Sequence, residues 1–482
     1  MVVRNKRWSD GEFNKMRQEV LAMWPTGREV DLDDAVAYHQ GMPPSKNYAL
    51  KVAEAKRSGA SLIRTDSGVA SIEEEIELFK HIQDEGHADL LGSINDSLTR
   101  TCRFEEAERG LKESLRTGKS ALNGFPIVPH GVTKTRKVID AVELPVQLRG
   151  NAVDLRLSTE IALASGHTAA SNGAMMSFWH YSKDVPLETC IRNCQYQYRL
   201  YGSYEERGVP ILAEPSGGFS FSTPYSLPHA GGIIDALLAA EQGAKNIVLS
   251  VFLQGNLAQD AAAITTLPRL GEEYLNRFGY KDVTVTVMSS CWGSIFPNDH
   301  AEAYALISLT AVTGVLAKAQ IVHFKTISER VTIPTKEANA ASLRAGKKVV
   351  NMLKDQKIEL DSGKVGIEAN MLEREIRTIV DRVIELGEGD VAVGAIRAVE
   401  SGVLDQPFAT TRYVAGRVMG VRDNEGAVRY LDHGHIPFAK EIFEFHREKI
   451  AERERAQGRK VDYKTVIDDI YAISRGCLVT RY

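Results

Sequence analysis

Charged side chains stand at the ends of several apolar runs that we expect to form strands. Asp66 ends "SLIRTD", Arg149 is next to last in "PVQLRG", Glu214 ends "VPILAE", and Arg100 follows shortly after "ADLLGSI". A guanidinium group pairs bidentately with a carboxylate or a phosphate, so two arginines at strand ends predict a site for such an anion. The alternative is that these charges form ordinary salt bridges on the surface.

The stretch "IRTDSGVA" at 63–70 brings opposite charges together. Side chains alternate along a strand, so Arg64 and Asp66 would share one face at a separation of about 7 Å. The chain then breaks at Ser67-Gly68, as expected where a strand passes into a loop. Asp66 is therefore predicted either to bind a substrate group or to pair with an arginine such as Arg64 or Arg100.

Motifs for the common nucleotide and metal sites are absent from the sequence. There is no G-x-G-x-x-G after a strand, no P-loop and no H-E-x-x-H. His433 and His435 in "LDHGHIPF" lack carboxylate support, which favours a polar loop over a metal site. Cys190 and Cys194 lie one helical turn apart, but no second pair follows, so zinc is not predicted. We therefore expect no metal ion bound directly by this chain.

The composition is that of a globular protein with no excess of basic charge. The 482 residues are 43% hydrophobic and 25% charged with a net charge of −4, so neither nucleic acid nor an acidic membrane is predicted as a partner. No apolar run approaches the roughly 20 residues that span a bilayer. The start, "MVVRNKRWSDGEFNK", lacks the apolar core of a secretory signal, and the five cysteines are scattered. We predict a cytoplasmic protein with reduced thiols.

Apolar runs alternate with helical patterns between about residues 60 and 330. The candidate strands are 61–66, 88–94, 123–128, 145–150, 173–179, 209–214, 246–253, 283–290 and 320–326, and the helical patterns between them include 71–86, 233–243 and 301–319. Apolar strands that alternate with helices indicate a parallel sheet, and a repeat of about 25 to 40 residues favours a closed (β/α)8 barrel. These nine candidate strands are one more than a (β/α)8 barrel contains, so one of them is expected to be a loop. The ranges 123–128 and 173–179 have the least regular patterns.

The pattern changes on both sides of this barrel. We predict an N-terminal helical arm at 1–58, a catalytic (β/α)8 barrel at 59–333 and a mostly helical C-terminal region at 334–482. In the last region 335–355, 368–387, 439–457 and 463–474 have helical patterns, while 426–438 is irregular or a hairpin. The predicted fold class is therefore α/β, a TIM-like barrel with helical additions at both ends. The site of such a barrel lies at the carboxyl ends of its strands.

Long and unusual strings of the sequence resemble one protein family from end to end. They are "WPTGREVDL" (24–32), "IQDEGHADLL" (82–91), "LNGFPIV" (122–128), "LLAAEQGAKNI" (237–247), "IPTKEANAA" (333–341), "SGVLDQPF" (401–408), "VRDNEGAVRYL" (421–431) and "VIDDIYAI" (466–473). The chain resembles the large, or epsilon, subunit of glutamate mutase, which is also called methylaspartate mutase. The resemblance implies a TIM-like barrel that stacks on a separate small cobalamin-binding subunit and pairs with a second copy of itself in a heterotetramer.

The resemblance also implies an adenosylcobalamin-dependent isomerase that rearranges a carbon skeleton through radicals. The sequence lacks the D-x-H-x-x-G motif that supplies a histidine to cobalt, so the corrin is expected mainly on the partner. The barrel would orient a small carboxylate substrate and shield radicals from water. By resemblance, Lys325 and Glu329 would hold the adenosine, and Asn123 and Gly68 would lie near the cofactor.

The expected substrate site departs from the family pattern. By resemblance, Arg100 and Arg149 would hold a substrate carboxylate and Tyr181 would position the substrate. A third arginine of the family is replaced here by an aspartate, and a glutamate, a tyrosine and a phenylalanine are replaced by serines. The four positions expected to set specificity are Asp66, Ser171, Ser177 and Ser216.

Three interpretations follow from the charge reversal at position 66. A carboxylate about 4 Å from Asp66 would be repelled by about 4 kcal/mol at an effective dielectric constant near 20. In the first interpretation, Asp66 receives a cation, Arg100 and Arg149 hold one carboxylate, and the substrate is an amino acid or related acid whose other part is polar or carries an amine. In the second, Arg64 replaces the missing arginine and the chain still converts L-glutamate to 3-methylaspartate. In the third, the chain is a non-catalytic barrel partner of a cobalamin protein.

Overall fold

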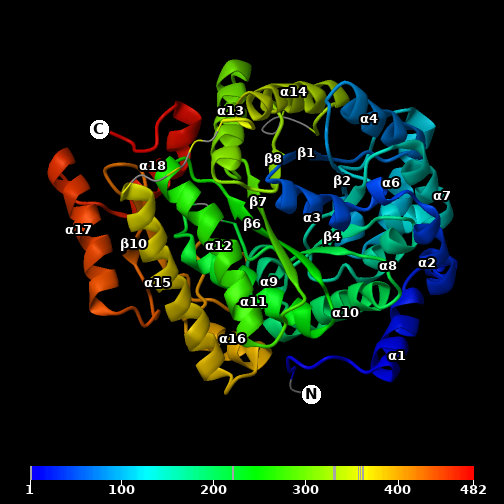
Figure 1. Ribbon diagram of the computed structural model, residues 1–482, viewed down its shortest axis with the longest axis horizontal. Helices are drawn as coiled ribbons and strands as arrows, with labels where there is room; N and C mark the ends of the chain where they lie inside the picture. The colour runs from blue at the N-terminus through cyan, green and yellow to red at the C-terminus, as the bar shows by residue number, and fades with distance from the viewer. Residues whose placement is uncertain are drawn as a thin grey trace.

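A closed barrel of eight parallel strands forms the centre of the molecule in the computed structural model (Figure 1). The structure describes residues 3–219, 222–328, 333–356, 358, 360 and 363–481. The strands follow one another around the barrel in chain order: β1 (Leu62–Ser67), β2 (Leu91–Ile94), β3 (Val146–Arg149), β4 (Ala169–Ser171), β5 (Leu212–Glu214), β6 (Asn246–Phe252), β7 (Thr284–Ser290) and β8 (Ile321–Phe324). β8 pairs with β1 and closes the barrel, with Arg64 opposite His323. The predicted (β/α)8 fold is confirmed.

Two of the predicted strands are wrong and one strand was missed. Residues 173–179 lie in helix α9 (Ala174–Tyr181), whose side chains are buried from Ala174 to Trp179. An apolar run of this length has no period that separates a buried helix from a buried strand. Residues 123–128 form a loop that leads into α7 (Ile127–Ala141), with a single bridge from Phe125 to Asn95. The missed strand is β4, which has only three residues, two of them alanines.

Helices follow the strands and cover the outside of the barrel. They are α4 (Ile72–Asp84), α5 (Ser97–Arg100), α6 (Phe104–Thr117), α7, α8 (Arg156–Ala164), α9, α10 (Leu187–Glu205), α11 (Ser226–Glu241), α12 (Leu257–Arg277), α13 (His300–Leu316) and α14 (Lys336–Leu353). The local sequence of α4 explains its start, because Ser71 caps the amide of Glu74 and glutamates fill the first turn. α14 packs against α13, α4 and β1, so it closes the ring of helices beyond residue 333. The division of the chain into three domains stays a prediction.

The N-terminal arm closes one mouth of the barrel. It contains α1 (Asp10–Leu21), η1 (Pro25–Glu29), α2 (Leu32–Gly41), η2 (Pro44–Lys46) and α3 (Tyr48–Ser58). Tyr48, Ala49 and Val52 of α3 pack in one apolar cluster with residues from the amino ends of the strands, including Leu212 and Ile321. This apolar plug leaves the carboxyl ends of the strands as the open end of the barrel.

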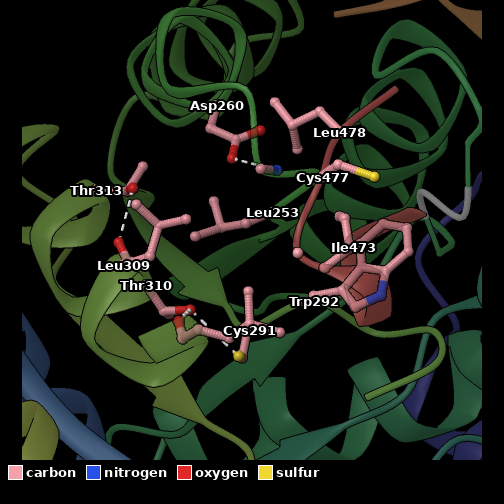
Figure 2. Close-up of a pocket in the computed structure, with 13 residues that line it drawn as sticks. Leu253, Asp260, Cys291, Trp292, Leu309, Thr310, Thr313, Ile473, Cys477 and Leu478 are labelled. Carbon is pink, nitrogen blue, oxygen red and sulfur yellow. Dashed lines mark hydrogen bonds between the residues drawn. The ribbon is translucent and has the colours of Figure 1, made fainter. Parts of the chain in front are cut away.

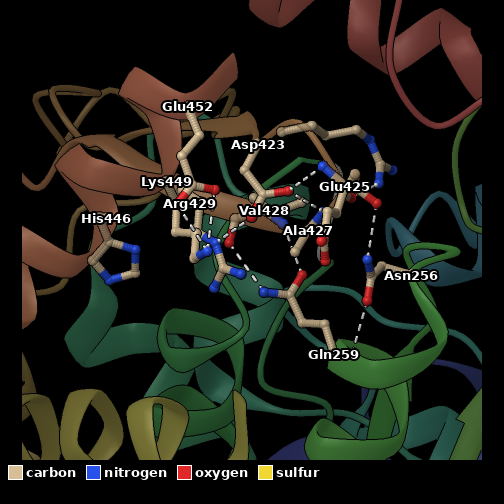
Figure 3. A network of polar contacts seen from close by, with 12 residues as sticks. Asn256, Gln259, Asp423, Glu425, Ala427, Val428, Arg429, His446, Lys449 and Glu452 are labelled. Carbon is tan, nitrogen blue, oxygen red and sulfur yellow. Dashed lines mark hydrogen bonds and ion pairs between the residues drawn. The ribbon is translucent and has the colours of Figure 1, made fainter. Parts of the chain in front are cut away.

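The C-terminal region packs beside the barrel against α11 and α12 (Figure 1). It contains α15 (Gly363–Leu386), α16 (Val391–Glu400), a hairpin of β9 (Met419–Arg422) and β10 (Val428–Asp432), α17 (Lys440–Gln457), α18 (Tyr463–Ala472) and η3 (Ile473–Arg475). The amide of Gln259 on α12 pairs with both backbone groups of Val428, at 2.8 and 3.1 Å, which fixes the hairpin to the barrel (Figure 3). The four predicted helices of this region are confirmed; α16 was not predicted, and only β10 of the hairpin lies within 426–438, which was expected to be irregular or a hairpin. Within the ranges that the structure describes, no helix is long and apolar enough to cross a membrane.

Candidate active site

Four charged side chains meet inside the barrel above the apolar plug. They come from β1, β3 and β5, and we call them the charge ring: Arg64, Asp66, Arg149 and Glu214. Arg149 Nε donates to Asp66 Oδ2 at 2.8 Å, and Arg64 Nε lies 3.1 Å from Asp66 Oδ1. Arg149 Nη1 lies 2.6 Å from Glu214 Oε2, and Arg64 Nη2 lies 3.5 Å from the same oxygen. Each carboxylate therefore contacts both guanidinium groups, and the ring as a whole is neutral.

The arginines keep both carboxylates of the ring ionised. Burial by itself would raise the pKa of Asp66, but Arg149, Arg64 and His323 hold it well below its usual range. Burial also acts to raise the pKa of Glu214, and Arg149 and Arg64 outweigh it, so that pKa is lowered too. A neutral carboxylic acid is therefore not part of this site at physiological pH.

A second layer of polar groups fixes the orientation of the ring. Arg64 is fully buried, donates to Tyr48 Oη at 2.8 Å and also hydrogen-bonds Gln147. Gln147 in turn donates to Glu214 at 2.9 Å. Gly92 of β2 lies between Asp66 and Arg149, where a Cβ would collide with the Asp66 carboxylate, so glycine is required for the two side chains to meet.

His323 is a site residue that the sequence analysis did not identify. Its Nε2 lies 3.2 Å from Asp66 Oδ2, and its Nδ1 lies 2.7 Å from the hydroxyl of Ser290 at the end of β7. The histidines showed no ligand spacing in the sequence. His323 can be assigned to the site only from the pairing of β8 with β1, which places it beside Arg64. The sequence does not give this pairing.

Arg100 and Tyr181 stand next to the ring at the open end of the barrel. The side chain of Arg100 lies over Gly150, where a Cβ would come within 2.7 Å of Arg100 Cδ, and its buried Nε has no hydrogen-bond partner among the residues that the structure describes. Tyr181 is 40% exposed. Burial raises the pKa of Tyr181, while Arg100 and Arg149 both act to lower it. That Arg100 and Arg149 hold a substrate carboxylate and that Tyr181 positions the substrate stay predictions.

The three serines expected to set specificity lie at different depths. Ser171 is 3.1 Å from the backbone oxygen and nitrogen of Gly150, beside Arg149. Ser216 donates to Glu214 at 3.3 Å. Ser177 is a fully buried residue of α9 and donates to the side-chain oxygen of Asn172 at 2.7 Å. Ser171 and Ser216 therefore adjoin the charge ring, whereas Ser177 packs behind it, and their role in specificity stays a prediction.

The residues expected on the cofactor side gather at the rim formed by β1, β2 and β8. Gly68 follows β1 and packs so closely on β2 that a Cβ would lie 2.5 Å from the carbonyl oxygen of Ile94. Asn123 is exposed and accepts a hydrogen bond from the Ser97 amide at 2.9 Å. Lys325 follows β8 and is half-buried. Glu329 lies outside the residues that the structure describes.

A separate pocket lies outside the charge ring, between α13 and the C-terminal tail (Figure 2). It has a volume of about 280 Å³ and is largely apolar, with Leu253, Trp292 and Ile473 among its walls. Two thiols, Cys291 and Cys477, also line it. In the described part of the chain no group of three or more His, Cys, Asp or Glu side chains is arranged to hold a metal ion.

These features define a (β/α)8-barrel protein whose polar site lies where barrel enzymes carry out their chemistry. A family model described as "Methylaspartate mutase E chain (MutE)" matches residues 42–482. The chain belongs to this family of glutamate mutase epsilon subunits, which are parts of a B12-dependent isomerase. The resemblance seen in the sequence is therefore confirmed.

Curated relatives match over almost the whole chain. The glutamate mutase epsilon subunit of Desulfitobacterium hafniense is 46% identical over 482 residues, covering 100% of this chain and 99% of the relative. That of Treponema denticola is 43% identical, covering 99% of each chain. That of Escherichia coli O157:H7 is 40% identical, covering 100% of each chain.

Proposed function

We propose that this chain is the catalytic large subunit of an adenosylcobalamin-dependent mutase whose substrate is not glutamate. The substrate would be an amino acid or related acid that offers one carboxylate to Arg100 and Arg149. Its other part would be polar or carry an amine directed at Asp66. The observation that carries this proposal is the charge ring, in which both carboxylates are already paired with the buried arginines.

The charge balance of the ring supports a substrate with one carboxylate. Asp66 and Glu214 neutralise Arg64 and Arg149, so Arg100 is the guanidinium that adds a net positive charge beside the ring. An unpaired Asp66 would repel a second substrate carboxylate by about 4 kcal/mol at 4 Å and an effective dielectric constant of 20. Arg64 and Arg149, which lie 3.1 and 2.8 Å from Asp66, offset much of this repulsion, so the neutral ring gives a second carboxylate no net attraction. Asp66 remains 12% exposed and can approach a cationic or hydrogen-bonding group.

The position of Arg64 argues against its replacing the missing arginine. Its side chain has no exposed surface and points toward Tyr48 and Gln147, on the side of the apolar plug. To reach a substrate it would have to break a buried ion pair with Asp66, which is costly. Its role is better explained as the counter-charge that lets Asp66 lie inside the barrel.

The residues on the cofactor rim fit an adenosine group. An ammonium at Lys325 and an amide at Asn123 offer donors and an acceptor to ribose hydroxyls. The cofactor supplies a carbon-centred radical when bound, while this chain would hold the substrate and exclude water. We propose that a small partner subunit holds most of the corrin. A homodimer of this chain within a heterotetramer and a cytoplasmic location stay predictions.

A substrate panel with the reconstituted complex tests the proposal. The chain would be purified with its small cobalamin-binding partner and adenosylcobalamin, and cob(II)alamin formation would be followed by electron paramagnetic resonance. We expect a radical signal with a monocarboxylate or amine-bearing acid and a much weaker one with L-glutamate. Normal turnover of L-glutamate would contradict the proposed substrate class, and silence with every acid would favour a non-catalytic barrel.

A further inference from the structure

Asp235 of α11 is a fully buried carboxylate that lies against the site without belonging to the charge ring. Its Oδ1 accepts the backbone N–H of Ala174 at 3.1 Å, and its Oδ2 accepts the N–H of Met175 at 3.1 Å. These amides open α9, the helix that ends in Tyr181. The first amides of a helix have no partner within the helix, so the carboxyl oxygens of a side chain at this place satisfy two of them.

The local sequence cannot supply this cap itself. The N-cap position of α9 is Gly173, which offers no side chain. A Cβ at Gly173 would lie 2.5 Å from Asp235 Oδ2 and 2.7 Å from the carbonyl oxygen of Ser216. Serine, threonine or aspartate, the usual N-caps, would therefore collide with the loop after β5. The cap must come from another element, and it ties α9 to α11.

The other end of α9 is held by the C-terminal region. The amide of Thr410 donates to the carbonyl oxygen of Trp179 at 2.8 Å. A helix of eight residues that is fixed at both ends has little freedom to tilt, so its ends determine where its last side chain points. That last side chain is Tyr181, the residue predicted above to position the substrate.

We propose that Asp235 is a positioning residue for the substrate, because it fixes the start of α9 and thereby sets the position of Tyr181 at the end of this helix. It does not touch the substrate or the cofactor. The part of this inference that concerns substrate rests on the function proposed above, since Tyr181 must contact the substrate. The part that concerns α9 depends only on the contacts of Asp235.

Hydrogen exchange on the isolated chain tests the hold on α9 without any cofactor. We expect Asp235→Ala to increase amide exchange over 174–181 at least tenfold and Asp235→Asn, which keeps one acceptor, to increase it far less. Glu205→Ala is the matched control. Glu205 accepts the N–H of Ile211 at 3.1 Å before β5, at the closed end of the barrel. Unchanged exchange over 174–181 in Asp235→Ala, or an equal increase in Glu205→Ala, would overturn the proposal.

Steady-state kinetics of the complete complex tests the action through Tyr181. We expect Asp235→Ala to raise KM for the substrate about tenfold with a smaller change in kcat, and Asp235→Asn to restore most of the loss. In a Tyr181→Phe background Asp235→Ala should add little, because residues that act through one another are not additive. If the increase in KM of the double variant equals the product of the increases in the two single variants, Asp235 does not act through Tyr181.

A second variant covers the case in which Asp235→Ala does not fold. Gly173→Ala introduces a Cβ that would lie 2.5 Å from Asp235 Oδ2 and so disturbs the same contact. This variant should raise both the amide exchange of α9 and KM for the substrate. A complex that turns over no acid would refute the proposed function, while the exchange result would still decide whether Asp235 holds α9. A normal KM in a folded Gly173→Ala variant with unchanged exchange would refute the inference.

Discussion

Asp66 and Glu214 lie inside the barrel because each contacts two guanidinium groups. A buried carboxylate without a partner would take up a proton or destabilise the fold. Here the pKa of each is lowered, and both arginines retain their charge. Removal of one member leaves the buried ring with one uncompensated charge, and this costs more than the removed pair itself contributes.

Asp66→Asn should therefore destabilise the chain strongly. We expect the free energy of unfolding in urea to fall by about 3 to 5 kcal/mol, because Arg64 and Arg149 lose a shared counter-charge. The matched control is Glu113→Gln, which removes an exposed partner of Arg116 on α6. That change should have little effect, because exposed ion pairs contribute little. Equal losses in the two variants would show that the ring is not the source of the effect.

Asp235 should make stability fall as pH rises. Burial raises its pKa to about 8, whereas the unfolded chain releases this proton near pH 4. Between these values the folded chain binds one more proton, so this group lowers the free energy of unfolding by up to about 1.4 kcal/mol per pH unit. We expect Asp235→Asn to gain stability relative to the unchanged chain from pH 5 to pH 8, as measured by urea unfolding. A difference that does not change with pH would contradict this assignment.

At the scale of elements, the loops at the carboxyl ends of the strands are held from outside the barrel. Three buried side chains fix the loop after β1. Glu75 of α4 accepts the Val69 amide at 2.8 Å, His130 of α7 lies 2.8 Å from the carbonyl oxygen of Ala70, and Asn339 of α14 donates to Ser67 Oγ at 2.8 Å. The loop that carries Gly68 is thus fixed by three different helices.

Asn339→Ala tests this support. Its amide also donates to the carbonyl oxygen of Thr335 at 2.8 Å, so the change removes two buried hydrogen bonds. We expect a loss of about 1 to 3 kcal/mol in the free energy of unfolding and faster hydrogen exchange at 67–70. Asn14→Ala, on the exposed side of α1, is the control and should change neither. Unchanged exchange at 67–70 would show that the other two contacts suffice.

The sequence predicted the barrel well where strands and helices have distinct periods. It failed at β4 because three residues give no alternation to read, and at α9 because a helix buried on all sides is as uniformly apolar as a central strand. The site could be predicted in part. Arg64 and Asp66 do share a face, but their pairing with Arg149 depends on the small residue Gly92 between the strands. The hold of Asp235 on α9 joins residues about 60 positions apart, and no local pattern encodes that distance.

At the scale of the whole molecule, the C-terminal region is attached through buried charges. Arg453 of α17 and Asp469 of α18 are fully buried and lie 2.5 Å apart. Asp469 also accepts the amide of Thr480 at 3.3 Å, and Arg422 donates to the carbonyl oxygen of Gln254 after β6 at 2.7 Å. These contacts connect the tail, the hairpin and the barrel rim, and they hold the wall that closes the apolar pocket of Figure 2.

Arg453→Ala should loosen this attachment. Asp469 would be left as an unpaired buried charge, so we expect a loss of about 3 to 5 kcal/mol in the free energy of unfolding. Limited proteolysis should then cleave within 473–481 first, as detected by mass spectrometry. Lys449→Ala on the same helix removes a half-exposed partner of Glu452 and serves as the control. Cleavage that begins elsewhere, or at the same rate in both variants, would refute the role of the Arg453–Asp469 pair.

The charge ring also limits the order in which mutations can accumulate. Each of its four residues contacts two others, so a sign change at one position is tolerated only if a neighbour has already changed or changes with it. Such epistasis makes single-site libraries at position 66 a poor route to new activities. A combinatorial library that varies 64, 66, 149 and 214 together would retain far more folded variants, and a chimaera with a crossover between 66 and 149 would function only when both parents carry matching sets.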